Sequence, residues 1–101
     1  MFALVVRFDL KDAPSAAAFD ALVALTGEGI RTTEPGTLVY ATHTVHDEPL
    51  ARVFYELYRD REAFEEHERR PHVRHFLEQR DQYVASTRVE FLNPAPSKGI
   101  D

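Results

Sequence analysis

Histidine is the residue of this chain with the clearest capacity for chemistry, because the imidazole pKa lies near neutral pH and the ring can take or give a proton there. The chain of 101 residues contains five histidines. His67 precedes Pro71 by one turn in a segment with helical spacing, and we expect it to act as a general base at the rim of a pocket. The competing interpretation is structural, an imidazole at a helix end that hydrogen-bonds a strand or the following turn.

A second group of histidines superficially suggests a metal site. His72 and His75 are three residues apart on a probable helix, close to His67 in sequence. At about 100° per residue, His75 points away from the apolar side of that helix and His72 lies near its edge, so we expect no metal and only solvated or capping roles for both. His43 shares a strand face with apolar residues, and it stands with His72 as the next candidate for the base.

Aromatic side chains could form the walls of a small-molecule pocket. They are concentrated in one part of the chain, as Tyr40, Phe54, Tyr55, Tyr58, Phe64 and Phe76. Such residues can sandwich a flat substrate while tyrosine hydroxyls orient it, although aromatic stripes more often form core. Arg7 could orient an anionic substrate or pair with Glu90 on a neighbouring strand, and pairing is the simpler expectation.

Composition excludes several classes of function. The net charge of −5 and the pI near 5.5 argue against a nucleic-acid surface, which needs clustered Lys and Arg. The absence of cysteine excludes disulfides, thiolate catalysis and Cys-ligated zinc. Neither G-x-G-x-x-G nor G-x-x-x-x-G-K-[ST] occurs, so we expect no nucleotide cofactor. Phe2–Leu10 lacks the features of a signal peptide, and we expect a cytoplasmic protein with no membrane partner.

Apolar periodicity predicts the element order β-α-β-β-α-β. Phe2–Leu10 alternates as a strand, with its even-numbered residues on one apolar face. A helix opens at Pro14-Ser15, with the serine as a cap, and its apolar stripe continues toward Thr33. Gly27 and Gly29 lie within this stripe and weaken the helix, so we expect a kink, a loosened last turn or an early end there.

The second half of the chain contains the other expected elements. They are strands over Thr37–Val45 and Arg52–Tyr58 about a turn at Asp47-Glu48-Pro49, helical segments over Arg61–Arg70 and from His72 onward, and a strand over Ser86–Leu92. Asp60 is the expected cap of the first helical segment, and Pro71 separates the two. We expect one domain over residues 1–92 and a flexible tail over residues 93–101.

This order is typical of a ferredoxin-like α+β fold, in which a four-stranded antiparallel sheet carries its helices on one side. The other face of the sheet keeps apolar residues, and such a face risks association when it is left in water. A small domain is also only modestly stable alone. We therefore expect a homodimer in which a second copy covers the bare face.

The stretch Glu34–Phe76 resembles the antibiotic biosynthesis monooxygenase (ABM) family. The likeness rests on Glu34-Pro35-Gly36 before a strand with Tyr40, on Phe54-Tyr55-Glu56-Leu57-Tyr58 followed by Asp60-Arg61-Glu62-Ala63-Phe64, and on an F-x-x-H-x-x-x-P-H-x-x-x-F pattern with His67, Pro71-His72 and Phe76. The resemblance implies a dimeric α/β barrel with a ligand pocket between sheet and helices. It implies His67 as the catalytic residue, with substrate contacts from Arg7, Tyr40, His43, Tyr58, Phe64, His72 and Phe76.

The same resemblance implies a cofactor-independent monooxygenase that acts on O₂ and an electron-rich aromatic, such as a hydroquinone or a polyketide phenol. A deprotonated, electron-rich ring can itself pass an electron to O₂, so the protein needs to bind the ring, take its proton and stabilise the anion, with Tyr40, Tyr58 and Arg7 as candidate stabilisers. Two alternatives stay open, an isomerase or lyase of a small oxygenated metabolite and a non-enzymatic ligand-binding dimer. Haem degradation is disfavoured, because the haem-binding branch of the family uses a Trp that this chain lacks.

Overall fold

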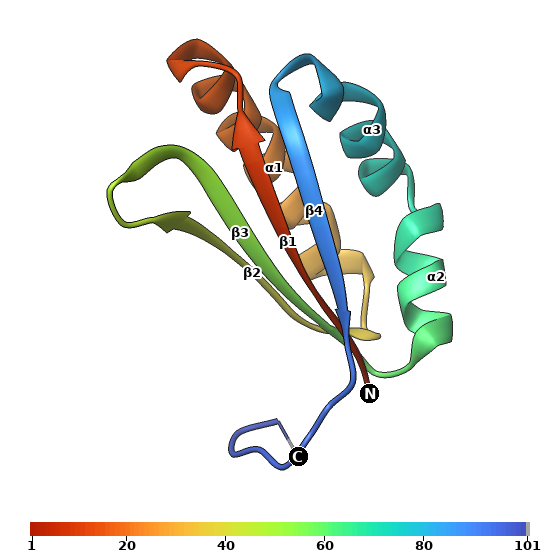
Figure 1. Ribbon diagram of the computed structural model, residues 1–101. Coiled ribbons are helices and arrows are strands. Elements are labelled where there is room, and N and C mark those ends of the chain that lie inside the picture. Colours follow the sequence, from red (N-terminus) through yellow and green to blue (C-terminus); the bar gives the residue numbers. More distant parts are fainter. Residues whose placement is uncertain (101) are drawn as a thin grey trace.

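The computed structural model describes residues 1–100, and its elements follow the expected order (Figure 1). They are β1 (Phe2–Leu10), α1 (Ala13–Thr33), β2 (Thr37–Val45), β3 (Glu48–Tyr58), α2 (Arg61–Arg69), α3 (Pro71–Gln79), the 3₁₀ turn η1 (Arg80–Gln82) and β4 (Val84–Leu92). Residues 93–100 contain neither helix nor strand. Asp101, the last residue of the expected tail, lies outside the described residues.

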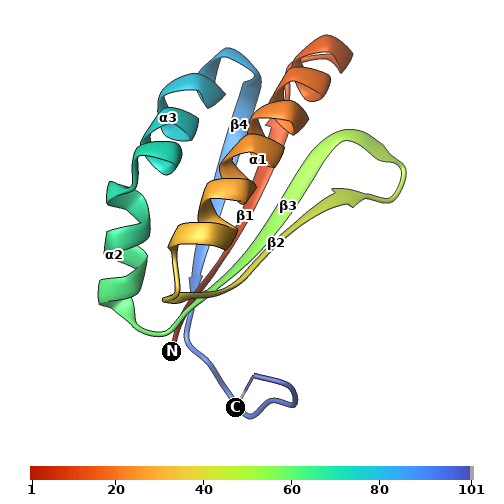
Figure 2. The ribbon, with the colours of Figure 1, turned by 180° about the vertical axis from the view of Figure 1, so that it is seen from behind.

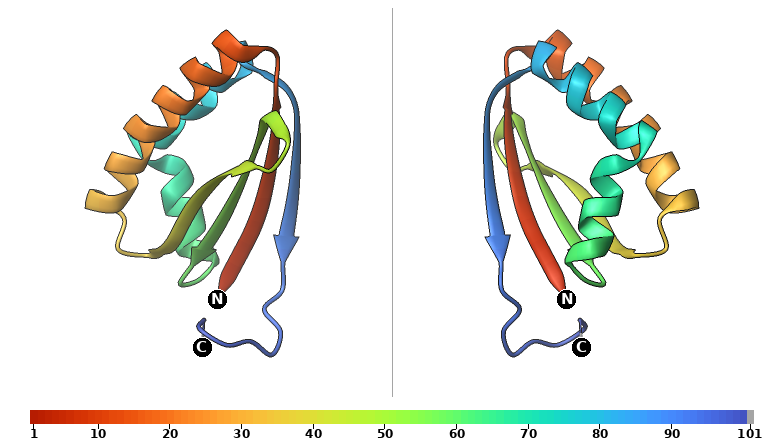
Figure 3. Two further views of the ribbon diagram at one scale, coloured as in Figure 1. Left: turned by 90° about the vertical axis from the view of Figure 1, so that its left-hand side faces the viewer. Right: turned by 90° about the vertical axis from the view of Figure 1, so that its right-hand side faces the viewer.

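The four strands form one sheet in the order β2-β3-β1-β4, and every neighbouring pair is antiparallel. Viewed from behind, the helices lie in front of the strands (Figure 2), and viewed edge-on they all lie on one side of the sheet (Figure 3). This arrangement confirms the ferredoxin-like α+β fold. None of the helices among residues 1–100 is both long enough and apolar enough to cross a membrane.

The core lies between the sheet and the helices. Leu4, Val6 and Phe8 of β1 are buried there, which confirms that the even-numbered residues of this strand form its inner face. Phe8 also joins an aromatic cluster whose ring centroids are 5.0 to 6.5 Å apart, made of Phe8, Phe19, Phe54 and Phe76. Through this cluster α1 and α3 pack against the middle of the sheet.

Helix α1 differs from the sequence expectation at both ends. Asp12, not Ser15, is the N-cap, and its carboxylate accepts a hydrogen bond from the Ser15 amide at 2.8 Å. The helix then continues without a break to Thr33, so of the expected kink, loosened last turn or early end, the early end was wrong. The cost of its two glycines is offset by the packing of the apolar stripe, which buries Phe19 and Ile30.

The hairpin is longer than expected. Strand β3 begins at Glu48, four residues before Arg52, because His46-Asp47 alone makes the turn. Asp47 has a φ of 61°, a left-handed conformation that aspartate tolerates better than most residues. Asp60 caps α2 as expected, by accepting a hydrogen bond from the Ala63 amide at 2.8 Å. The break between α2 and α3 at Pro71 is also confirmed.

Candidate active site

A cavity of about 210 Å³ lies between the sheet and the helices α2 and α3. Its walls are mainly apolar and include Leu4, Phe8, Phe54, Phe76, Val89 and Phe91. Tyr40, Glu56 and His67 add polar groups to the same wall, and its exposed members are Glu68, Val89 and Phe91. An apolar cavity with a few convergent polar groups is the usual form of a small-molecule site, and this one holds the histidine that the sequence predicts to be the base.

A wider groove of about 410 Å³ runs between α1 and β2. It shares Tyr40 with the cavity, and Arg31 and Glu34 are its ionisable residues besides this tyrosine. No imidazole lies in its lining among the described residues. We therefore place the candidate active site in the smaller cavity.

His67 lies in the last turn of α2 with its imidazole almost completely buried. Its Nδ1 is 2.7 Å from Oε1 of Glu34, and its Nε2 is 3.8 Å from Oε1 of Glu56. An ionised carboxylate can only accept a hydrogen bond, so Nδ1 donates to Glu34 and Nε2 is the nitrogen that can take or give a proton. Glu56, the residue on the Nε2 side of the ring, also belongs to the cavity wall.

Glu34 is the residue that holds this imidazole. It is the C-cap of α1, where the amide of Glu34 donates to Ile30 and Pro35 prevents the helix from continuing. Its buried carboxylate accepts three hydrogen bonds, from Thr37 Oγ1 at 2.8 Å, His67 Nδ1 at 2.7 Å and His72 Nε2 at 2.5 Å.

Burial alone would raise the pKa of Glu34, but the hydrogen bonds from His67 and Thr37, the charge of His67 and the hydrogen bond from His72 outweigh it. The pKa of this carboxyl therefore lies below the usual value of a glutamate. Glu34 is ionised at neutral pH as a result, and a fixed negative charge sits behind the candidate base.

Glu56 and Tyr58 project from the inner face of β3. The Tyr58 hydroxyl donates to Glu56 Oε1 at 2.5 Å, and both side chains are buried. Burial raises the pKa of Glu56, against the opposing effects of this hydrogen bond and of the His67 charge. Burial and the Glu56 charge raise the pKa of Tyr58 as well, so the phenol stays protonated and keeps donating to the carboxyl.

Tyr40 lies on β2 opposite Glu56 in the register and lines the cavity. Burial, together with the charges of Glu56 and Glu34, raises its pKa, so its phenol also stays protonated. Within residues 1–100 its hydroxyl makes no hydrogen bond to another side chain or to the backbone. Tyr40 therefore offers a free donor to a bound molecule.

Phe64 and Phe76 both line the cavity, as the resemblance implied. Phe64 stacks on Phe2 with a centroid distance of 4.9 Å, and its ring is 6.4 Å from that of His67. Phe76 is part of the aromatic core, 5.8 Å from Phe19. Tyr58 does not line the cavity: its fully buried ring packs against Phe64 and His67, with centroids 5.3 and 5.2 Å away, and its hydroxyl bonds Glu56.

Arg7 lies on the other face of the sheet, away from the cavity. Leu4, Val6 and Phe8 face the helices, so the odd-numbered Arg7 faces away from them. Its guanidinium contacts Asp9 at 3.0 Å and Glu48 at 2.8 Å. The expected pair with Glu90 is wrong, because the register places Glu90 opposite Val5.

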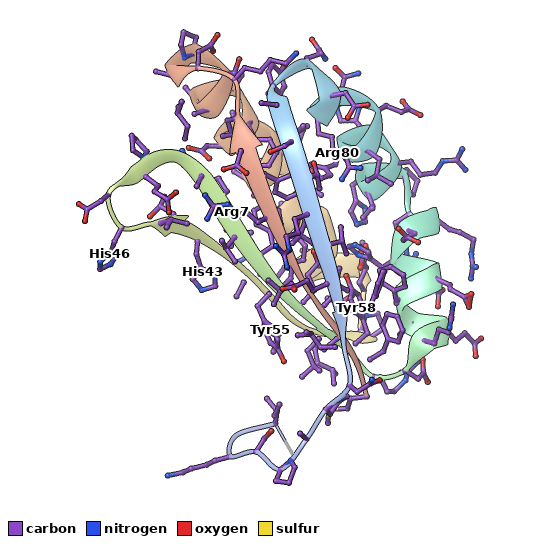
Figure 4. The ribbon with its side chains drawn as sticks, viewed as in Figure 1. Arg7, His43, His46, Tyr55, Tyr58 and Arg80 are labelled. Atoms are coloured by element: carbon purple, nitrogen blue, oxygen red, sulfur yellow. The ribbon has the colours of Figure 1, made fainter. Side chains whose placement is uncertain are left out.

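His43 is also remote from the cavity. It lies three residues after Tyr40 in a regular part of β2 and so points to the opposite face. Its Nδ1 is 3.0 Å from the Val53 carbonyl oxygen, and the side chain is exposed. Figure 4 looks onto the face without helices, where His43 and Arg7 can be compared with Tyr58 beside α2.

The two histidines of α3 differ from each other. His75 is exposed, as its helical position predicts. His72 is neither solvated nor capping, because its Nε2 bonds the same carboxylate that holds His67. No group of three His, Asp or Glu side chains among residues 1–100 has an arrangement that could hold a metal ion.

The sequence interpretation missed two carboxylates of the candidate site, Glu34 and Glu56. A signal for Glu56 was present. Phe54, Glu56 and Tyr58 alternate along a strand and so share one face, and an acidic residue between two inward-facing aromatic residues is unusual. Glu34 belongs to the Glu34-Pro35-Gly36 motif of the resemblance, but nothing in that motif indicates a role for its carboxylate. Its histidine partners are 33 and 38 residues away in the sequence, and only the packing of α2 and α3 against the end of α1 brings them together.

Comparison with known proteins gives a consistent family. The sequence profile of the family described as Antibiotic biosynthesis monooxygenase matches residues 1–79, which include Glu34, Glu56 and His67. No curated protein matches the sequence. Among solved structures, Rv0793 from Mycobacterium tuberculosis has a TM-score of 0.85 and 27% identity, with 96% of this chain and 97% of that chain covered.

Two further structures extend the comparison. Protein SO0527 from Shewanella oneidensis has a TM-score of 0.77 and 29% identity, with 90% of this chain and 87% of that chain covered. A structure from Lactobacillus acidophilus NCFM has a TM-score of 0.85 and 27% identity, with 91% of this chain but only 43% of that chain covered. Because the family profile spans most of the sequence, the chain belongs to the antibiotic biosynthesis monooxygenase family.

Proposed function

We propose that the protein is a cofactor-independent monooxygenase whose substrate is a small, electron-rich phenol or hydroquinone. The observation that carries this proposal is the imidazole of His67, held at Nδ1 by Glu34 with Nε2 directed toward the wall of an apolar cavity. A buried base of this kind can remove a phenolic proton, and the surrounding aromatic rings suit a flat substrate.

The proposed reaction balances without an external reductant. The phenolic proton moves to Nε2 of His67, and the resulting electron-rich ring passes electrons to O₂. A C–O bond forms at an unsubstituted ring carbon ortho or para to the phenolate oxygen. The ring hydrogen is then lost, the O–O bond breaks, and one oxygen stays as a carbonyl while the other leaves as water. The substrate supplies all four electrons, and the base returns its proton to that water.

The cavity favours a small and uncharged substrate. Its volume of about 210 Å³ lies below the range of about 300–1,000 Å³ of pockets for drug-sized ligands, so one or two rings are the expected size. The carboxylates of Glu34, Glu56 and Glu68 lie around the base and disfavour an anionic substrate. In the cavity wall described here the one guanidinium is that of Arg80, which lies 5.9 Å over the Phe8 ring.

Tyr40 has a distinct part in this proposal. A phenolate produced by the base carries negative charge that a nearby donor can stabilise. The free Tyr40 hydroxyl stays protonated, because burial raises its pKa, and it lines the same cavity as His67. The two rings have centroids 6.2 Å apart, so the base and the donor can reach one small molecule.

The test is oxygen uptake with a panel of naphthohydroquinones and simple phenols, corrected for uptake without protein. His67→Ala should keep the folded state and lower turnover roughly 10²-fold or more, the usual scale of general-base catalysis. His75→Ala, an exposed histidine on the neighbouring helix, is the matched control and should change neither. Full turnover in folded His67→Ala contradicts the assignment. Proton exchange without oxygen uptake would indicate an isomerase, and neither activity would favour a ligand-binding protein.

We also propose that the protein is a homodimer in the cytoplasm. Support for the dimer comes from half-buried apolar residues on the face of the sheet without helices, such as Val5, Val39 and Val53, and from exposed Leu92 at the end of β4. Light scattering at low micromolar concentration should give a mass near twice 11.6 kDa. A monomer at that concentration would contradict it.

A further inference from the structure

His72 has a structural relationship to the candidate base that its sequence position does not suggest. It does not line the cavity, yet its Nε2 is 2.5 Å from Oε2 of Glu34, while Oε1 of the same carboxylate is 2.7 Å from Nδ1 of His67. The carboxylate is thus fixed at both oxygens by two imidazoles from different helices. With one oxygen bound to each ring, Glu34 cannot rotate without breaking one of these bonds.

Gly29 determines where the His72 ring can lie. A Cβ at position 29 would be 2.6 Å from Cγ and 2.8 Å from Nδ1 of His72, distances that force the ring to move. At Gly27, one half-turn earlier on the same helix, a Cβ would meet no heavy atom within 4 Å. Because Gly29 has no side chain, the imidazole of His72 on α3 has room to reach Glu34 at the end of α1.

We infer that Gly29, His72 and Glu34 form a positioning chain that holds His67 as the base. Gly29 admits the His72 ring, His72 fixes one oxygen of Glu34, and the other oxygen fixes Nδ1 of His67 so that Nε2 faces the substrate. His72 and Gly29 touch no substrate and act only through the base. The catalytic consequence of this positioning chain rests on the proposed function. The hydrogen bonds of the positioning chain can be measured without any substrate.

The charges around the positioning chain support this arrangement. Glu34 is the ionisable group that faces His72 from α1, and His67 faces the same carboxylate from α2. On the far side of His67, Glu56 from β3 is the facing group, at 3.8 Å from Nε2. His67 is thus held between two carboxylates, and a displaced Glu34 would release Nδ1, so that the ring could turn and Nε2 would lose its fixed direction.

The experiment compares four variants. His72→Leu removes the donor to Glu34, and His72→Gln keeps an amide N–H that can replace it. Gly29→Ala displaces the ring without altering any polar group, and Gly27→Ala is its matched control. Circular dichroism first establishes that each variant is folded.

The first readout is the ¹H–¹⁵N NMR signal of the proton on Nδ1 of His67, recorded without substrate. We expect a slowly exchanging, strongly downfield signal in the wild type, in Gly27→Ala and in His72→Gln. In Gly29→Ala and His72→Leu we expect it to move upfield or to be lost to exchange. A signal that stays at the wild-type position in both of these variants overturns the inference.

The second readout is steady-state oxygen uptake. His72→Leu and Gly29→Ala should lower kcat roughly tenfold or more, the usual effect of removing a residue that orients a functional ligand, while KM changes little. His72→Gln should recover most of kcat. An unchanged kcat in His72→Leu overturns the inference. If the wild type consumes no oxygen, the proposed function fails. The NMR readout alone then decides whether Gly29, His72 and Glu34 position His67.

Discussion

The two faces of the sheet each have a network of charged side chains, and the two networks differ in burial more than in distance. On the helix side, Glu34 bonds His67 and His72 at 2.7 and 2.5 Å, and its side chain is 3% exposed. On the other face, Arg7 bonds Asp9 and Glu48 at 3.0 and 2.8 Å, with a side chain 34% exposed.

The comparison shows that short distances between charges do not identify a functional site. An exposed ion pair competes with water and with salt. It therefore contributes little to stability, and it shifts the pKa of a neighbouring catalytic group only slightly. A buried carboxylate with three donors has no water to replace them, so each donor depends on it. Only the buried network can hold an imidazole in one orientation and one tautomer.

The largest effect should come from Glu34→Ala. This change leaves the buried donor of His67 and the half-buried donors of His72 and Thr37 without an acceptor, and we expect a loss of about 2–4 kcal/mol in the free energy of unfolding. Urea denaturation measures it. Glu48→Ala in the exposed network is the control and should shift the midpoint far less. Equal shifts would remove the distinction between the two faces.

The next effect is a pH dependence of opposite sign for the two buried carboxyls. The pKa of Glu34 is lowered in the folded protein, so its contribution to stability is present above the unfolded pKa of about 4.3 and is lost as the pH falls through the folded value. The pKa of Glu56 is raised, so its contribution is present below about 4.3 and is lost as the pH rises through its folded value.

Denaturation of Glu34→Gln and Glu56→Gln from about pH 2 to about pH 8 can separate these two effects, because the Glu34 contribution changes below about 4.3 and the Glu56 contribution above it. Relative to the wild type, Glu34→Gln should become less stable as the pH rises, and Glu56→Gln should become more stable. Parallel pH profiles for the two variants would contradict a lowered pKa of Glu34 and a raised pKa of Glu56 in the folded state.

The sequence predicted the parts of this comparison that depend on local patterns. Alternation placed Leu4 and Phe8 on the inner face, and an aspartate before a helical segment identified the cap at Asp60. It also singled out His67 among five histidines, through its spacing to Pro71 and the F-x-x-H-x-x-x-P-H-x-x-x-F pattern, and the structure buries this residue on α2.

The remaining parts depend on contacts between distant residues. The register of β4 against β1 decides that Arg7 faces Arg88 and not Glu90, and no local pattern contains that register. The bond from His72 to Glu34 depends on the approach of α3 to the end of α1, which Gly29 permits. Helix propensity correctly marks this glycine as unfavourable, but it cannot show which side chain needs the space.

A smaller effect is expected from the glycines of α1. Gly27→Ala should raise the free energy of unfolding by up to about 1 kcal/mol, because alanine favours the helix and its Cβ meets no atom within 4 Å. Gly29→Ala gains the same propensity but must displace His72, so its net change should be smaller or negative. Thermal denaturation of both variants measures the difference, and equal gains would mean that the His72 ring moves at no cost.

The smallest effect should come from Arg7→Gln, on the face without helices. Hydrogen bonds to Glu48 and Asp9 raise the pKa of Arg7, but the guanidinium is charged at neutral pH with or without them, and its partners are solvated. We expect a thermal midpoint within experimental error of the wild type in 0.5 M salt, where screening weakens exposed pairs. The KM and kcat for oxygen uptake should also stay unchanged, because Arg7 points away from the cavity that holds His67. A raised KM would show that Arg7 reaches the substrate after all, and the site would then have to include the open face of the sheet.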